Sequence, residues 1–242
     1  MTLKDKIILI TGGANGIGAA TALECAARGA GVIVADRDEH GGARVAAACG
    51  GWFVPVDVAD EPSVQAMYAR LGERHGRLNV LLHAAGILKG AYVPLQDFSV
   101  ETWRQVLEVN ALGSFLCAKH AVPLMQAAGS GVIVLVTSGA AQGVSSSFAY
   151  GASKAAINNL GNTLSAGLAA ANIRVNLVSP GGIDTDMKRS VIAADLERQG
   201  KLADLEQAVQ ASGLGSARGV ARVLAWLASD EADYVRGVVS TR

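Results

Sequence analysis

The segment IILITGGANGIG, residues 7–18, joins a short apolar run to a glycine-rich turn that opens a helix. The continuous apolar run Ile7–Ile10 is typical of a strand covered on both faces in a parallel sheet. Glycines 12, 16 and 18 let the turn close tightly and let backbone N–H groups approach a pyrophosphate. A glycine-rich turn alone has two interpretations, a structural turn or a nucleotide site. Its place between a first strand and a first helix favours a dinucleotide site.

Strand-like and helix-like segments continue to alternate after this first unit. Short runs rich in β-branched residues predict further strands at residues 32–35, 53–56, 80–82, 132–136 and 174–178. Longer Ala-rich stretches predict helices at residues 16–28, 62–75, 100–127 and 149–171. This alternation predicts an α/β fold with right-handed crossovers, a Rossmann-type doubly wound parallel sheet flanked by helices.

The length and composition of the chain favour one domain over residues 1–242. Half of the 242 residues are hydrophobic, which is enough for a sizeable core, and no linker, charge block or repeat divides the sequence. Only residues 184–212 break the alternation, with a polar, charged stretch that follows a strand end. Open α/β sheets place their ligands at such ends. We therefore expect a substrate-covering segment there, with a plain surface helix pair as the alternative.

Charge and cysteine content narrow the class of protein. The chain has 21 Lys and Arg against 21 Asp and Glu, so no global field attracts nucleic acid or an anionic membrane. Cys25, Cys49 and Cys117 are scattered without metal-ligand spacing, and we interpret all three as reduced core thiols. No leader peptide or bilayer-spanning run is evident. These features predict a cytoplasmic enzyme of small molecules without a metal.

Acidic residues follow the second and third predicted strands. Asp36 lies about 20 residues after the glycines, where a carboxylate accepts both ribose hydroxyls of an adenosine, and this favours NAD. The alternative is an exposed loop aspartate. Arg37 keeps NADPH open, because a guanidinium there can hold a 2′-phosphate. Asp57 is a candidate for the adenine edge or, alternatively, a helix N-cap in the run 57–60.

Tyr150 and Lys154 lie four residues apart at the start of an Ala-rich helix, so both side chains share one face. A tyrosine titrates near pKa ~10, and a neighbouring ammonium lowers that pKa. The pair is therefore a candidate proton-transfer device. Taken alone, such a pair is more often a surface feature.

Together, these motifs resemble the short-chain dehydrogenase/reductase family. The resemblance rests on Thr11–Gly18, Asp36, Asn110, Ser138, Tyr150, Lys154 and Pro180–Gly181. Local stretches at 84–88 and 179–187 also resemble the NAD-linked dihydrodiol dehydrogenases that form dihydroxybenzoate. The family resemblance implies that Tyr150 is the acid/base and that Ser138 holds the substrate oxygen. It also implies that Lys154 lowers the tyrosine pKa and holds the nicotinamide ribose, while Asn110 anchors a proton-relaying water.

The resemblance further implies a set of cofactor-binding residues. Ile183 and Thr185 fall where this family binds the carboxamide of nicotinamide. The full set is Gly12, Asn15, Gly16, Ile17, Gly18, Asp36, Arg37, Asp57, Val58, Ala84, Ala85, Gly86, Asn110, Tyr150, Lys154, Pro180, Gly181, Ile183 and Thr185.

Three features depart from the family pattern. Ser138 and Tyr150 are one residue closer than usual; Thr137 would restore the spacing, but Ser138 begins the family-like serine turn and remains the choice. His83 replaces an asparagine, and we expect a hydrogen-bonded strand-end residue there. The usual glycine-rich tail does not follow residues 237–239, which leaves tetramer and dimer both open.

The predicted function is hydride transfer between NAD(H) and a secondary alcohol or ketone by a Tyr-Lys-Ser-Asn mechanism. The alternatives are an NADPH-dependent ketoreductase of 3-oxoacyl type and a non-catalytic, dinucleotide-sensing Rossmann protein. Phosphoryl transfer is disfavoured, because the glycine loop lacks the Gly-Lys-Ser/Thr ending.

The sequence also predicts the walls of the substrate pocket and the contact between subunits. The pocket walls are expected at 89–93, 139–148 and 187–196, where Lys89, Lys188 and Arg189 meet a carboxylate or face solvent. A homo-oligomer is expected through the helices that begin near Val100 and Phe148, with small residues such as Gly161, Ala166 and Gly167 at the contact.

Overall fold

Seven parallel strands form one sheet in a computed structural model that describes residues 1–241. The strands are β1 (Ile7–Thr11), β2 (Gly31–Asp36), β3 (Trp52–Pro55), β4 (Val80–His83), β5 (Gly131–Val136), β6 (Ile173–Ser179) and β7 (Gly237–Ser240). Their order across the sheet is β3-β2-β1-β4-β5-β6-β7. The order reverses between β1 and β4, and such a switch point opens a crevice at the carboxyl ends of the strands.

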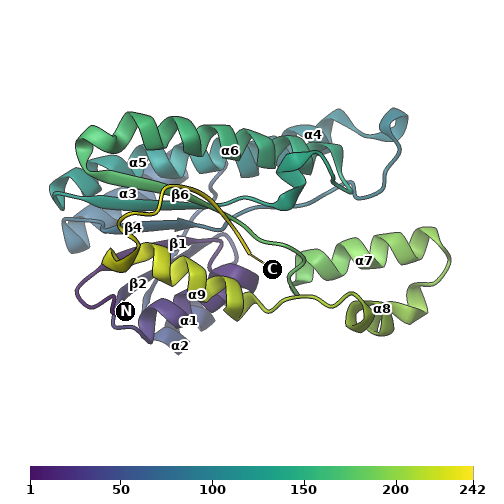
Figure 1. The fold of residues 1–242 in the computed structure, drawn as a ribbon, viewed down its shortest axis with the longest axis horizontal. Coiled ribbons are helices and arrows are strands. Elements are labelled where there is room, and N and C mark those ends of the chain that lie inside the picture. The colour runs from purple at the N-terminus through teal and green to yellow at the C-terminus, as the bar shows by residue number, and fades with distance from the viewer. Residues whose placement is uncertain (242) are drawn as a thin grey trace.

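Helices cover both faces of the sheet (Figure 1). They are α1 (Gly16–Ala26), α2 (Glu39–Cys49), α3 (Glu61–His75), α4 (Val100–Leu107), α5 (Gly113–Ala127), α6 (Phe148–Leu168), α7 (Asp186–Arg198), α8 (Leu205–Ala211) and α9 (Ala217–Ala228). Helices α3, α5 and α6 lie on one face, and α1, α2 and α9 lie on the other. The predicted doubly wound, single-domain α/β fold is therefore confirmed. Among residues 1–241, no helix combines the length and the apolarity needed to cross a bilayer.

The apolar strand runs are buried as expected. Every residue of β5 and β6 is buried, and successive side chains alternate between the two helical layers. Cys25 and Cys117 lie in the core, where burial raises the pKa of each thiol to about 12. Cys49 is only half-buried, and it packs against the edge of the core.

The predicted helix over 100–127 is interrupted. It consists of α4, a π-helical turn at Glu108–Leu112, and α5. The turn contains Asn110, whose side chain is bonded to the backbone of Ile87 on the neighbouring loop. The periodic pattern of a helical sequence does not indicate a tertiary contact of this kind. The pattern also did not indicate α2, whose Gly42 is required because a Cβ there would lie 2.1 Å from the Phe53 ring.

One predicted oligomer contact is wrong. Gly161 faces the sheet, because a Cβ on it would lie 2.7 Å from the Leu177 side chain. Gly167, on the same helix, is exposed and has free space around it.

Residues 184–212 form the helix pair α7 and α8, which projects beyond the carboxyl end of the sheet (Figure 1). Backbone bonds fix its base: Asp184 N–H donates to the Gly215 carbonyl at 2.9 Å, and Gly215 N–H donates to the Gly182 carbonyl at 2.8 Å. At the far end of α7, the Arg198 guanidinium lies 5.3 Å from the centre of the Tyr92 ring. The segment is thus held at its base and near its tip.

Candidate active site

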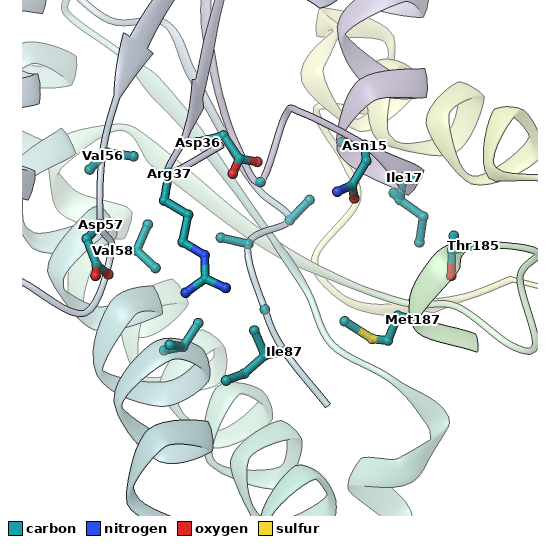
Figure 2. Close-up of a pocket in the computed structure, with 17 residues that line it drawn as sticks. Asn15, Ile17, Asp36, Arg37, Val56, Asp57, Val58, Ile87, Thr185 and Met187 are labelled. Atoms are coloured by element: carbon teal, nitrogen blue, oxygen red, sulfur yellow. The ribbon is translucent and has the colours of Figure 1, made fainter. Parts of the chain in front are cut away.

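A cavity of about 270 Å³ lies at the switch point of the sheet (Figure 2). It is lined by Gly12, Asn15, Gly16, Ile17, Gly18, Asp36, Arg37, Val56, Asp57, Val58, Ala84, Ala85, Gly86, Ile87, Val109, Thr185 and Met187. Thirteen of these were predicted from the sequence as cofactor-binding residues. The sequence motifs missed Val56, Ile87 and Val109, which carry no polar signal, and Met187 was expected in the substrate pocket, whose cavity it also lines.

The glycine turn has the shape that a dinucleotide needs. A Cβ on Gly12 would lie 2.6 Å from the Ala85 backbone, and one on Gly18 would lie 2.0 Å from the Gly12 carbonyl oxygen. Gly16 has φ +53°, a conformation that favours glycine. No side chain caps the start of α1, and its first turn carries no acidic residue. Free N–H groups and the positive end of the helix dipole therefore face the cavity and fit a pyrophosphate.

The Asp36 carboxylate is held in place by the backbone. One oxygen accepts from Ala14 N–H and the other from Asp38 N–H, each at 3.0 Å. A carboxylate offers about four acceptor sites, so each oxygen retains capacity for a ribose hydroxyl. Arg37 lines the same cavity and extends away from the Asp36 carboxylate towards Ile87 (Figure 2).

Asp57 also lines this cavity, and its alternative role as a helix cap is wrong. Its carboxylate accepts from Ala59 N–H at 2.9 Å, which forms a local turn. The N-cap of α3 is Asp60, which accepts from Ser63 N–H at 2.9 Å.

A second cavity, of about 380 Å³, adjoins the first. The two share the lining residues Ile17, Ala84, Gly86, Thr185 and Met187. The second cavity also contains Leu88, Val136, Thr137, Ser138, Gly139, Ala140, Val144, Ser145, Ser146, Tyr150, Lys154, Pro180, Gly181, Gly182, Ile183, Lys188 and Val191. The predicted wall at 89–93 does not line it among the described residues; the neighbouring Leu88 does. An apolar cavity with a few converging polar groups is typical of a small-molecule site.

Ser138 and Tyr150 meet in this second cavity. Tyr150 lies in the first turn of α6, where its N–H donates to the N-cap hydroxyl of Ser147. Ser138 lines this cavity with Tyr150 and lies close enough to lower the pKa of the phenol, whereas the buried Thr137 hydroxyl donates to the Lys154 carbonyl at 3.2 Å. The geometry thus favours Ser138 over Thr137 as the hydroxyl beside the phenol.

Burial sets the protonation of the pair. Desolvation raises the pKa of Tyr150 above its usual value, and the nearby Ser138 hydroxyl opposes this rise only in part. The direction is opposite to the lowering expected from Lys154. The Lys154 amine donates to the Val136 carbonyl at 2.9 Å and lies 5.6 Å from the centre of the tyrosine ring. Burial lowers the pKa of Lys154 to about 8.

Asn110 supports the site from outside both cavities. Its amide bridges the Ile87 backbone, accepting from the N–H at 2.8 Å and donating to the carbonyl at 2.9 Å. It also donates to the Ser153 hydroxyl at 2.9 Å. These bonds engage the side-chain amide of Asn110, and its main-chain carbonyl accepts from the Ser114 hydroxyl.

His83 is a buried strand-end residue, as its position predicts. Its Nδ1 lies 2.7 Å from the Thr11 hydroxyl, within hydrogen-bond distance. Burial and the nearby Lys154 lower the pKa of His83 to about 3, so the ring is neutral. Within residues 1–241, no cluster of three or more His, Cys, Asp or Glu side chains has a metal-binding arrangement.

We expect Lys154→Met to stabilise the cofactor-free protein at pH 7. The shift of the lysine pKa from 10.5 to about 8 corresponds to a burial cost on the order of 3 kcal/mol. Between these values the unfolded chain holds a proton that the folded chain lacks, so wild-type stability rises with pH. The gain from the substitution should be full below pH 8 and shrink towards pH 10.5.

Urea unfolding of both proteins from pH 7 to 10.5 measures this difference. Lys4→Met removes an exposed lysine and serves as the control. A stability difference that does not change with pH would contradict the assignment of the shifted pKa to Lys154.

The doubly wound sheet, the glycine turn at its switch point and the adjoining cavity that contains Ser138, Tyr150 and Lys154 are typical of a dinucleotide-binding α/β protein. A family model described as enoyl-(acyl carrier protein) reductase matches residues 12–241. The chain belongs to the short-chain dehydrogenase/reductase family. It is thus an oxidoreductase of alcohol or ketone substrates that uses a nicotinamide dinucleotide.

Two curated relatives and one solved structure illustrate the similarity. Cis-4-hydroxycyclohexanecarboxylate dehydrogenase of Sinomonas cyclohexanicum is 39% identical, with 97% of this chain and 94% of the relative aligned. A 3-oxoacyl-(acyl-carrier-protein) reductase of Escherichia coli is 33% identical, over 98% of this chain and 95% of the relative. The crystal structure of levodione reductase superposes with a TM-score of 0.90 at 30% identity, covering 98% and 96% of the two chains.

Proposed function

We propose that the protein is an NAD-dependent dehydrogenase that interconverts a secondary alcohol and its ketone. The observation that carries this proposal is that Tyr150 and Ser138 line one cavity, which adjoins the glycine-rich nucleotide cavity and shares five lining residues with it. The polar groups of the second cavity suit a single reacting oxygen.

The chain's own residues would handle the proton and the oxygen. A bound nicotinamide supplies the hydride acceptor or donor. In oxidation, the ionised Tyr150 takes the hydroxyl proton and becomes the phenol; in reduction, the phenol gives its proton to the ketone oxygen and becomes the phenolate. Ser138 donates a hydrogen bond to the same oxygen and stabilises its developing charge. Because burial raises the pKa of Tyr150, the resting side chain is a phenol, which is the form that reduction requires.

Separate parts of the two cavities would hold the cofactor. The glycine turn at 12–18 would bind the pyrophosphate, and Asp36 would bind the adenosine ribose. Lys154 would hold the nicotinamide ribose, and Ile183 with Thr185 would receive the carboxamide; all three line the second cavity. The helix pair at 184–212 would cover the substrate. We also place the enzyme in the cytoplasm, where free cysteines stay reduced.

The substrate is proposed to be a compact secondary alcohol on a ring. The name of the relative from Sinomonas identifies such an alcohol, and a cavity of about 380 Å³ is at the small end for ligand sites. The second candidate is an NADPH-dependent 3-oxoacyl reductase, which Arg37 in the nucleotide cavity and the Escherichia coli relative favour. A non-catalytic dinucleotide sensor would not require the Tyr150 and Lys154 pair.

Tyr150→Phe should fold and bind NADH normally but lose at least a hundredfold in kcat, because it removes only the proton-carrying oxygen. Ser138→Ala should lose a comparable amount through lost charge stabilisation. Thr137→Ala is the matched control, since its hydroxyl serves the Lys154 carbonyl. The rates are measured by NADH absorbance with cyclic secondary alcohols. A Tyr150→Phe enzyme that keeps more than about a tenth of the wild-type kcat would remove Tyr150 from the proposed mechanism.

NAD should be preferred over NADP by roughly a hundredfold in kcat/KM. A 2′-phosphate about 4 Å from the Asp36 carboxylate would cost on the order of 4 kcal/mol at an effective dielectric constant of 20. Asp36→Asn removes the charge while leaving an oxygen for the backbone contacts, and it should shift the ratio towards NADP. Asp38→Asn removes the same charge at the N-cap of α2 and should leave the ratio nearly unchanged. Equal use of both cofactors by the wild type would show that Arg37 governs the site.

We further propose a homo-oligomer, a tetramer or a dimer, formed through α4, α5 and α6. Trp103, Leu112, Phe115 and Phe148 lie on or next to these helices, and each is more than 40% exposed. Such apolar exposure is typical of a subunit contact. Light scattering at micromolar concentration should give a multiple of the 24.7 kDa mass, and Phe115→Glu should lower it. Leu202→Glu, on an exposed turn of 184–212, is the control. A monomeric wild type would refute the assembly.

A further inference from the structure

The three cationic side chains that the sequence predicts near the substrate have different surroundings in the structure. Lys89 is exposed, and its amine donates to the Gln105 amide oxygen at 2.8 Å. Arg189 is paired with Asp184 at 2.7 Å and with Glu206 at 3.0 Å, so its charge holds α7 against α8. Only Lys188 of the three lines the second cavity.

The charge of this second cavity is one-sided. Its lining contains Lys154 and Lys188 and no aspartate or glutamate. Lys154 is buried and bonded to the Val136 carbonyl. Lys188 is half-buried, and within residues 1–241 no ion pair joins it to a carboxylate. No carboxylate therefore balances the two amines, and of the two only the Lys188 amine has no hydrogen-bond partner within residues 1–241.

Lys188 is also poorly explained by its own helix. It lies in the first turn of α7, where its N–H donates to the N-cap hydroxyl of Thr185. The N-terminal end of a helix is the positive end of its dipole, where a lysine is disfavoured and an anion is favoured. Neither helix stability nor an ion pair accounts for the charge.

We propose that Lys188 binds a carboxylate of the substrate, so that the enzyme acts on ring secondary alcohols and ketones that carry a carboxylate away from the reacting carbon. The inference rests on the proposed function. In the proposed reaction Tyr150 and Ser138 hold the reacting oxygen, and Lys188, in the first turn of α7, lines the same cavity. A substrate with both groups would thus be fixed at two points, which orients its carbinol carbon.

The position of Lys188 separates this role from cofactor binding. Thr185 and Met187 line both cavities, but Lys188 lines only the second one. A lysine that served the pyrophosphate would face the glycine turn. We therefore expect its loss to change recognition of the substrate rather than recognition of the dinucleotide.

The test compares 4-hydroxycyclohexanecarboxylate with 4-hydroxycyclohexanecarboxamide, which has a similar shape and no charge. A charged hydrogen bond should favour the acid by about tenfold or more in kcat/KM. Lys188→Met should abolish this acid-to-amide ratio, chiefly through KM for the acid, and Lys188→Arg should restore much of it. Lys89→Met is the matched control and should leave the ratio unchanged.

Calorimetry with cyclohexanecarboxylate and cyclohexanecarboxamide on the NADH-bound enzyme tests the same contact without turnover. Tighter binding of the acid that is lost in Lys188→Met supports the proposal. If neither alcohol is oxidised, that failure counts against the proposed reaction but not against the carboxylate contact. An equal preference for acid and amide, or an acid preference that survives in Lys188→Met, would overturn it. A weaker NADH affinity in Lys188→Met would reassign the lysine to the cofactor.

Discussion

The close approach of two backbones at the switch point is the constraint on which the site depends. The turn after β1 passes so near Ala85 that Gly12 has no room for a Cβ, and α1 begins so close to that turn that Gly18 has none either. This contact brings the carboxyl ends of β1 and β4 together and aims the free N–H groups of α1 into the cavity. A side chain at either glycine would separate these elements and fill the space that a pyrophosphate needs.

The sequence predicts the sheet and most of the nucleotide cavity, because both depend on local patterns. Buried strands such as β5 are continuous apolar runs, and the glycine turn combines a spacing with a place in the chain. The interruption at Glu108–Leu112 could not be predicted in this way. It accompanies the bonds from Asn110 to Ile87, a contact between segments 23 residues apart that leaves no periodic trace. Apolar lining residues such as Val109 could not be predicted either, because an apolar residue in the sequence can belong to a cavity wall or to the core.

The second cavity shows a different limit of sequence reasoning. The Tyr150 and Lys154 spacing predicts that they are neighbours, but it says nothing of how deeply they are buried. Burial here dominates their pKa values, raising that of the tyrosine and lowering that of the lysine. In the same way, Lys188 and Arg189 are equivalent in the sequence. Only the ion pairs of Arg189 with Asp184 and Glu206 distinguish a structural cation from a free one.

The segment that contains α7 and α8 begins and ends at neighbouring positions, because Ile183 before it and Gly215 after it form an isolated β-bridge. The chain between these two residues is therefore a loop with adjacent ends, and a change in its length need not move the strands below it. Evolution can lengthen, shorten or replace such an insertion while the dinucleotide crevice keeps its shape. The bridge thus allows selectivity and hydride chemistry to diverge on separate parts of one chain.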